Sequence, residues 1–278
     1  MKNVTLLDGA MGTRLWELSE AAGEARAPTW TYNLTHPEFV TAIAREYAAA
    51  GSQILLTNTF AVNAHALRGT PCTVAGVVSA AVAAAKAAAG PGVRVALDVG
   101  PLGVMLEPCG DLSEEEASAV FAELASAGAD AGAELIMFET FMDLAMLSCA
   151  VKAAKRFGLP VFASMTFQKD GCTMMGDRVP AIAETLAACG ADAIGLNCSL
   201  GPTDALPVLR AFAAASGLPL IFKPNAGLPV KGPDGRTTHP YTAEIFAAES
   251  APALETAAYV GACCGSDAGY IRALKALL

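Results

Sequence analysis

Short apolar runs alternate along the whole chain with longer stretches rich in Ala, Glu and Leu. Eight of the apolar runs are typical of strands, and they cover residues 4–8, 52–58, 93–98, 134–140, 160–166, 193–198, 220–225 and 257–262. Strands that alternate with helices pair in parallel, so the pattern predicts an α/β protein.

The stretches between these runs have helical start and stop signals. In "SEEEASAVFAELASAGA", Ser113 and Glu116 have the spacing of a capping box, which marks a helix N-terminus. Several predicted helices end in a glycine shortly before the next strand, at Gly51, Gly158 and Gly190. The chain is therefore predicted to contain eight β-then-α units.

Eight such units in fewer than 300 residues fit a (β/α)8 TIM barrel, and we expect one domain over residues 1–278. A doubly wound open sheet is the alternative, because it shows the same alternation. That fold more often has a Gly-rich phosphate fingerprint after its first strand, and "DGAMGT" lacks the three-glycine spacing.

Composition narrows the class of protein. Apolar residues make up 54% of the chain and charged residues 16%, which is typical of a globular protein. A net charge of −9 disfavours binding to nucleic acid or to an anionic membrane. The first residues show no signal-peptide pattern, and eight cysteines without an export signal suggest reduced thiols. We therefore expect a cytoplasmic protein.

In a barrel, the chemistry lies at the C-terminal ends of the strands. Nearly every predicted strand ends in a polar or metal-capable side chain: Asp8, Asn58, Asp98, Glu139, Thr166, Cys198, Asn225 and the pair Cys263 and Cys264. This arrangement predicts a functional site on that rim.

Three of these residues suggest a metal. Cys198 ends the sixth strand, and Cys263 and Cys264 end the eighth, so their sulfurs can converge on one rim. Three thiolates suit Zn²⁺ and leave its fourth position open, as in catalytic zinc sites.

Other uses of cysteine compete with the metal hypothesis. A lone Cys usually packs as a small hydrophobe. A vicinal disulfide between Cys263 and Cys264 would be strained. Catalytic thiol chemistry would need a histidine, and none of the histidines lies at a predicted strand end. We expect small hydrophobes at Cys72, Cys149 and Cys189, and free loop thiols at Cys109 and Cys172.

Seven motifs in order carry a resemblance over nearly the whole chain: "LLDGAMGT", "TNTF", "FET", "SMTF", "GLNCSLGP", "KPNAGLP" and "GACCGS". Together they resemble the zinc-dependent homocysteine S-methyltransferase family, and most closely the homocysteine-binding domain of cobalamin-dependent methionine synthase. The resemblance implies a (β/α)8 barrel with zinc on Cys198, Cys263 and Cys264. Gly261 and Ala262 stand where the family usually has two glycines, a change that removes no ligand.

The resemblance also implies the substrate contacts. Asp8 and Glu139 would pair with the ammonium of homocysteine, and the backbone amides of Gly9 and Ala10 would receive its carboxylate. Glu139 ends a very apolar run, where a charge without a partner would be costly. The alternatives are a helix N-cap for Asp8 and a surface carboxylate for Glu139.

Three further residues are assigned more loosely. Ser164 and Thr166 are expected to line the pocket. Asn225 could lend its side-chain oxygen to zinc while substrate is absent, or simply form a turn.

The implied reaction transfers a methyl group to the homocysteine thiol and gives methionine. The chain has no room for a cobalamin-binding domain, so we expect methylcobalamin on a separate corrinoid protein as the donor. One alternative is a small sulfonium donor such as S-methylmethionine, and another is a non-catalytic zinc or amino-acid binding protein. The Gly- and Pro-containing segment 228–242 is a candidate lid or docking edge.

Overall fold

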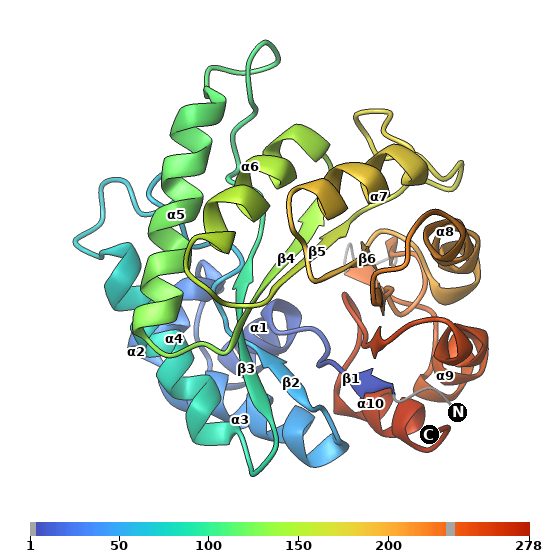
Figure 1. Ribbon diagram of the computed structural model, residues 1–278. Coiled ribbons are helices and arrows are strands. Elements are labelled where there is room, and N and C mark those ends of the chain that lie inside the picture. The colour runs from blue at the N-terminus through green and yellow to red at the C-terminus, as the bar shows by residue number, and fades with distance from the viewer. Residues whose placement is uncertain (1–3, 232–236) are drawn as a thin grey trace.

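Eight parallel strands form the centre of the molecule in the computed structural model, which describes residues 4–231 and 237–278 (Figure 1). Each predicted strand is present. The bounds are β1 Thr5–Leu6, β2 Ile54–Leu56, β3 Arg94–Val99, β4 Leu135–Phe141, β5 Val161–Met165, β6 Ala193–Asn197, β7 Leu220–Lys223 and β10 Tyr259–Val260.

The order of the strands is that of a barrel. Hydrogen-bonded neighbours run β1-β10-β7-β6-β5-β4-β3-β2, so strands that follow one another along the chain lie side by side. The two ends of this order also meet, because the Gln53 amide donates to the Leu6 carbonyl at 2.7 Å and the Gln53 side chain accepts from the Leu6 amide at 3.1 Å. The (β/α)8 prediction is confirmed, and the doubly wound alternative is wrong.

Helices surround the strands on the outside (Figure 1). Their bounds are α1 Gly12–Ala21, α2 Tyr32–Thr35, α3 Pro37–Ala50, α4 Val74–Ala88, α5 Glu114–Asp130, α6 Leu144–Lys155, α7 Val179–Ala188, α8 Pro202–Ala215, α9 Ala243–Ser250 and α10 Ala268–Lys275. The capping box of α5 forms as predicted, with Ser113 and Glu116 each accepting from the other's backbone amide. Helix α3 is capped at its C-terminus by Gly51, whose φ of 115° favours glycine.

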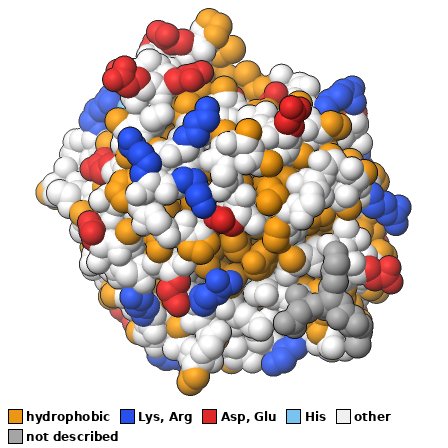
Figure 2. Space-filling view, viewed as in Figure 1, with side chains coloured by type: hydrophobic (Ala, Val, Ile, Leu, Met, Phe, Trp, Pro, Cys, Tyr) orange, Lys and Arg blue, Asp and Glu red, His pale blue; other side chains and the backbone are white. Residues whose placement is uncertain are grey.

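None of the helices in the described ranges is long and apolar enough to cross a membrane. On the face shown in Figure 2, Lys and Arg are interspersed with Asp and Glu around a central group of hydrophobic side chains. The cytoplasmic location stays a prediction.

Side chains inside the barrel follow the two-residue period of strands. The lower layer is apolar and contains Leu7, Ile54, Leu56, Ala96, Leu135, Met137, Phe162, Ala193 and Ile221. Two residues further along a strand, the same alternation directs the next side chain inward at the C-terminal end. At that level the residues are polar: Asp98, Glu139, Ser164 and Lys223, with Asn197 four residues after Ala193. We call these five residues the polar layer.

Gly195 separates the two layers on β6, and it should tolerate no side chain. A Cβ there would lie 2.1 Å from the carbonyl oxygen of Ile221 on β7. Because backbone must move to relieve this clash, Gly195→Ala should lower the free energy of unfolding by about 1–3 kcal/mol or more. Urea denaturation measures this, and Gly217→Ala is the control, since nothing lies within 4 Å of a Cβ at Gly217. Equal stability of the two variants would contradict the assignment.

Candidate metal and substrate site

Three cysteines converge above the polar layer. Cys198 follows β6, while Cys263 and Cys264 follow β10. Their sulfur atoms all lie within 4.8 Å of one another, and the Sγ atoms of Cys198 and Cys264 are 3.8 Å apart. Cys263 is buried and the other two are half-buried. The predicted convergence is therefore present.

The loop after β6 is held in an unusual conformation. Cys198 and Ser199 have φ angles of 57° and 52°, in the left-handed region that is costly for residues other than glycine. Hydrogen bonds hold both: the Cys198 amide donates to the Lys223 carbonyl at 3.0 Å, and the Phe167 amide donates to the Ser199 hydroxyl at 3.2 Å. This conformation presents Cys198 to the other two cysteines.

The Cys pair is fixed in the same way from β7. The Cys263 amide donates to the Pro224 carbonyl at 2.8 Å, and the Cys264 amide donates to the Asn225 side-chain oxygen at 3.1 Å. Asn225 thus already has a hydrogen-bonding role at the triad, and its role as a metal ligand stays a prediction.

The donor set fits a zinc ion. A hydrogen bond with Cys263 lowers the pKa of Cys198, but contact with Cys264 and burial outweigh it and raise the pKa to about 11. For Cys264, the hydrogen bond with Cys198 is likewise outweighed by contact with Cys263 and by burial, which raise the pKa to about 12. Contact with Cys198, together with burial, also raises the pKa of Cys263 well above its ordinary value. The three crowded thiols thus retain their protons at neutral pH, and a divalent cation that takes the place of the protons would offset the negative charges of the three thiolates.

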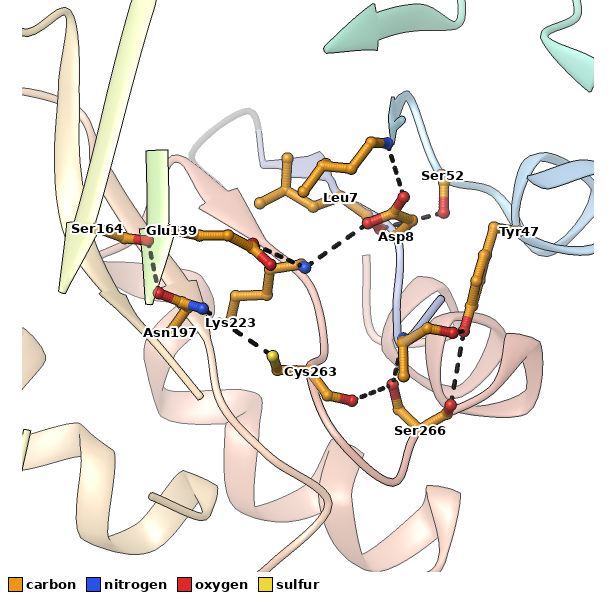
Figure 3. Close-up of polar contacts among 12 residues, drawn as sticks. Leu7, Asp8, Tyr47, Ser52, Glu139, Ser164, Asn197, Lys223, Cys263 and Ser266 are labelled. Atoms are coloured by element: carbon orange, nitrogen blue, oxygen red, sulfur yellow. Dashed lines mark hydrogen bonds and ion pairs between the residues drawn. The ribbon is translucent and has the colours of Figure 1, made fainter. Parts of the chain in front are cut away.

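A buried ion pair lies beneath the cysteines (Figure 3). The ammonium of Lys223, on β7, donates to Glu139 Oε2 at 3.0 Å and lies 3.8 Å from Asp8 Oδ1. Asp8 Oδ2 accepts from the Leu56 amide at 2.7 Å. Glu139 is therefore buried rather than on the surface, and its charge has a partner within the chain. The argument that its charge requires a ligand loses its basis, so its pairing with a substrate ammonium stays a prediction.

More carboxyl groups than cations occupy this layer. Asp98 lies within electrostatic range of Glu139, Lys223 and Asp8. Burial, followed by the Glu139 charge, raises the pKa of Asp98 well above its ordinary value. Burial also raises the pKa of Asp8 to about 7, against the lowering effect of Lys223. The Lys223 ammonium thus offsets the charges of three carboxyl groups, those of Asp8, Asp98 and Glu139.

Asn197 joins three strands and the Cys pair. Its side-chain oxygen accepts from the Thr140 amide and from the Ser164 hydroxyl, each at 2.7 Å. Its amide nitrogen donates to Thr140 Oγ1 at 2.7 Å and lies 3.9 Å from the Cys263 sulfur (Figure 3). Thr140 has a φ of 66°, so this clamp stabilises the strained residue directly after Glu139.

The turn after β1 is packed tightly against the Cys pair's loop. The Ala10 amide donates to the Ser266 hydroxyl at 3.1 Å, and the Tyr47 hydroxyl donates to the Ala10 carbonyl at 2.7 Å. A Cβ on Gly9 would lie 2.7 Å from the Ser266 oxygen. Helix α1 is preceded by Met11 as its N-cap, so the alternative that Asp8 caps a helix is wrong.

The remaining predicted residues have structural contacts as well. Ser164 is fully buried and bonded to Asn197, while the Thr166 hydroxyl is 3.5 Å from the Phe141 carbonyl. Their contact with substrate stays a prediction. Asn58 is bonded to α2 and to the turn of helix before it, with its side-chain amide donating to the Thr29 carbonyl and to Asn33 Oδ1.

The other cysteines lie away from the triad, and all eight cysteines are free thiols. Cys72 and Cys189 are half-buried and Cys149 is buried; all three pack against the core, as expected of small hydrophobes. Cys109 is exposed, and Cys172 is buried although it follows a loop.

The candidate lid borders the Cys pair. Its described part contains β8 (Val230–Lys231), which pairs antiparallel with β9 (Thr237–Thr238). His239, just after β9, packs so closely on Gly265 that a Cβ there would lie 2.2 Å from the imidazole Cγ. Residues 232–236 of this segment lie outside the described residues.

The strand-end argument missed Lys223, Asn197 and Ser266. Lys223 and Asn197 could have been found from the alternation of inward-pointing side chains along each strand. Lys223 comes two residues after the interior Ile221, and Asn197 comes four residues after the interior Ala193. A lysine in the apolar run "LIFKPN" also predicts a buried ion pair. Ser266 had no comparable signal in the sequence.

Comparison with known proteins places the chain in a family. The sequence profile described as "Homocysteine S-methyltransferase" matches residues 5–278. The chain belongs to this family. Two curated relatives are the methionine synthases of Mycobacterium leprae and Mycobacterium tuberculosis, 29% and 31% identical over 99% of this chain. The aligned region is 24% of each relative, so the chain spans about a quarter of their length.

Solved structures share the fold of this family member. The oxidized form of the homocysteine methyltransferase MmuM from Escherichia coli has a TM-score of 0.82, and its metallated form one of 0.81. Each is 22% identical, over 99% of this chain and 96% of that chain. At this identity the similarity shows the fold alone.

The raised pKa of Asp8 predicts a pH effect on stability. In the unfolded chain Asp8 ionises from about pH 3.8, whereas in the folded protein it keeps its proton up to about pH 7. The folded state therefore binds more protons in this interval, and wild-type stability should fall relative to Asp8→Asn as pH rises from 4 to 7. The limiting change is about 4 kcal/mol, with little further change above pH 7.

Urea denaturation of both proteins across this pH range measures the difference. Asp111→Asn is the control, because Asp111 is exposed, and it should show no such pH-dependent difference from wild type. A constant difference between wild type and Asp8→Asn at every pH would contradict the prediction.

Proposed function

We propose that this chain binds homocysteine through its sulfur at a zinc ion held by Cys198, Cys263 and Cys264, and that the sulfur takes up a methyl group to give methionine. The convergence of three sulfurs within 4.8 Å on the barrel rim is the observation that carries the proposal. Membership of the homocysteine S-methyltransferase family supports the substrate.

The triad accounts for activation of the thiol. A free alkyl thiol has a pKa near 8.5, so only a few per cent is thiolate at pH 7. Zinc bound to the three cysteines would supply a Lewis acid that keeps an added thiol deprotonated. A proton-accepting histidine is therefore not required at the sulfur. The methyl carbon forms its new bond to sulfur as its bond to the donor breaks, and that electron pair leaves with the donor.

The chain's own residues orient the rest of the substrate. The buried carboxyl groups that include Asp8 and Glu139 lie beside the triad and would attract an ammonium. The turn at Gly9 would receive the carboxylate, since Gly permits close backbone approach. The Ala10 amide already donates to Ser266, so in this proposal Gly9 has the larger part.

Metal content tests the first half of the proposal. Protein purified without chelator should contain one zinc ion per chain, and Cys198→Ala, Cys263→Ala and Cys264→Ala should each lose most of it, because two thiolates hold zinc less tightly than three. Elemental analysis measures this. Cys109→Ala is the control, since Cys109 is an exposed thiol outside the triad. Wild-type zinc content in all three triad variants would rule out the site.

The methyl donor is proposed to be methylcobalamin carried by a separate corrinoid protein. Matches to methionine synthases that are about four times longer than this chain support this choice. The loops after β2, β3, β4, β5 and β7 also expose large apolar side chains, at Phe60, Val104, Met105, Met142, Met174, Met175, Leu228 and Val230. These side chains surround the rim that bears the triad, and apolar side chains gathered around a site are typical of a protein-binding surface.

Assays with each donor separately test this choice. Free methylcobalamin should give methionine, and a cognate corrinoid carrier should raise the rate. Met174→Glu, at the most exposed of these positions, should reduce only the carrier's stimulation, because it places a charge on the docking rim without touching the triad. Efficient turnover with S-methylmethionine and none with methylcobalamin would favour a small sulfonium donor. Homocysteine binding without turnover on any donor would favour a binding protein.

A further inference from the structure

The side-chain amide of Asn197 has one orientation that its neighbours allow. Its oxygen accepts from the Thr140 backbone amide at 2.7 Å, and a backbone N–H can only donate. The Ser164 hydroxyl donates to the same oxygen at 2.7 Å. Exchange of the oxygen and nitrogen positions would place an NH₂ group against the Thr140 N–H, so the hydrogen-bond network fixes the amide as it stands.

This orientation directs one N–H of Asn197 at a sulfur. The nitrogen donates one hydrogen to Thr140 Oγ1 at 2.7 Å, which leaves its second hydrogen for the Cys263 Sγ, 3.9 Å from the nitrogen (Figure 3). The two residues are 0% and 8% exposed, so little solvent reaches the contact. A thiol sulfur is a weak acceptor, whereas a hydrogen bond to a charged acceptor is about twice as strong as one between neutral groups. The contact is therefore strengthened when Cys263 becomes a thiolate.

The sulfur of Cys263 thus differs from its neighbours in the triad. The Sγ atoms of Cys198 and Cys264 face each other at 3.8 Å, whereas Cys263 faces a side-chain donor from outside the triad. Asn225, on the other side of the Cys pair, directs its oxygen at the Cys264 backbone amide and not at a sulfur. Because Asn197 directly precedes Cys198, the end of β6 supplies one sulfur of the triad and the hydrogen-bond donor to another.

We propose that Asn197 is a positioning residue for the metal, whose second amide N–H donates to the Cys263 thiolate and holds that sulfur as a ligand. The inference rests on the proposed function, because it takes Cys263 to be a metal-bound thiolate. A sulfur that shares its negative charge with an N–H donates less electron density to the metal. The metal then attracts an added thiol more strongly, so Asn197 acts on the substrate sulfur through Cys263.

The wild-type protein loaded with the magnetic isotope of cadmium tests the bond directly. Cadmium, like zinc, binds thiolates, and its nucleus couples to a proton across an N–H···S–Cd hydrogen bond. NMR should show this scalar coupling at the side-chain amide of Asn197. Absence of the coupling in protein whose three cysteines bind cadmium would overturn the inference. This measurement does not depend on the folding of any variant.

Asn197→Leu and Thr140→Val form a matched pair. Leucine approximates the shape of asparagine without its N–H groups, while valine has the shape of threonine and removes only the hydroxyl, leaving the N–H that points at Cys263. Asn197→Leu should lower zinc affinity by about 10- to 100-fold, the usual effect of losing such an outer hydrogen bond, and competition with a chelator measures this. Thr140→Val should retain zinc affinity close to that of the wild type, and circular dichroism verifies the fold of both variants.

The absorption spectrum of the cobalt-loaded protein separates this role from a merely structural one. In Asn197→Leu, the sulfur-to-Co²⁺ charge-transfer band should move to longer wavelength, because a thiolate without the hydrogen bond gives up an electron at lower energy. In Thr140→Val the band should stay in place.

The outcomes also separate this inference from the proposed function. Equal changes of the band in the two variants, or an unchanged band and unchanged zinc affinity in Asn197→Leu, would overturn the role of Asn197 while leaving the metal site standing. A wild-type protein that binds neither zinc nor cadmium at the three cysteines would overturn the proposed function, and this inference with it.

Discussion

The ion pair between Lys223 and Glu139 is the contact on which the carboxyl end of the barrel depends. Both side chains point into the barrel because strand periodicity leaves them no other direction, and both are almost fully buried. Either charge alone would be strongly destabilising there, since burial of an unpaired charge costs several kcal/mol. The Lys223 ammonium donates to Glu139 Oε2 at 3.0 Å, so the two charges neutralise each other. The polar layer can therefore lie directly on the apolar layer of the barrel.

The same layer positions the sulfurs. Lys223 lies at the end of β7, and its carbonyl accepts the Cys198 amide, so the residue that neutralises Glu139 also fixes the first cysteine. Asn197, one residue before Cys198, clamps Thr140, which directly follows Glu139. The charged pocket and the triad are thus tied through adjacent residues of β4, β6 and β7. A shift of the charged pocket would therefore strain the triad, and a shift of the triad would strain the pocket.

The fold was largely predictable because its signals are local. Each strand is a short apolar run, and helix ends such as Ser113 and Gly51 can be recognised within a few residues. The triad was also predictable, since barrel topology alone brings the ends of the sixth and eighth strands to one rim.

The electrostatics of the pocket were not predictable to the same degree. Whether Glu139 faces an ammonium depends on which residue of β7 points inward, and that depends on the register between strands distant in sequence. The Ser266–Ala10 contact joins the two ends of the chain, and no pattern within either segment specifies it.

The charge distribution at this rim fits the zwitterionic thiol of the proposed function. Three thiolates around a divalent cation would have a net charge of −1, and the three carboxyl groups with Lys223 have −2 when all are ionised. A ligand with an ammonium at one end and a sulfur at the other can therefore lower the free energy of both regions at once. In the proposed function, the substrate sulfur would take the open position at the metal, while its ammonium would replace a proton or would donate to an unpaired acceptor oxygen among the acids. Burial raises the pKa of Asp98 well above its ordinary value. With that acid protonated the pocket has a net charge of −1, which one further monovalent cation balances. A single amino acid would supply that charge, so in the proposed function substrate binding and charge balance are the same event.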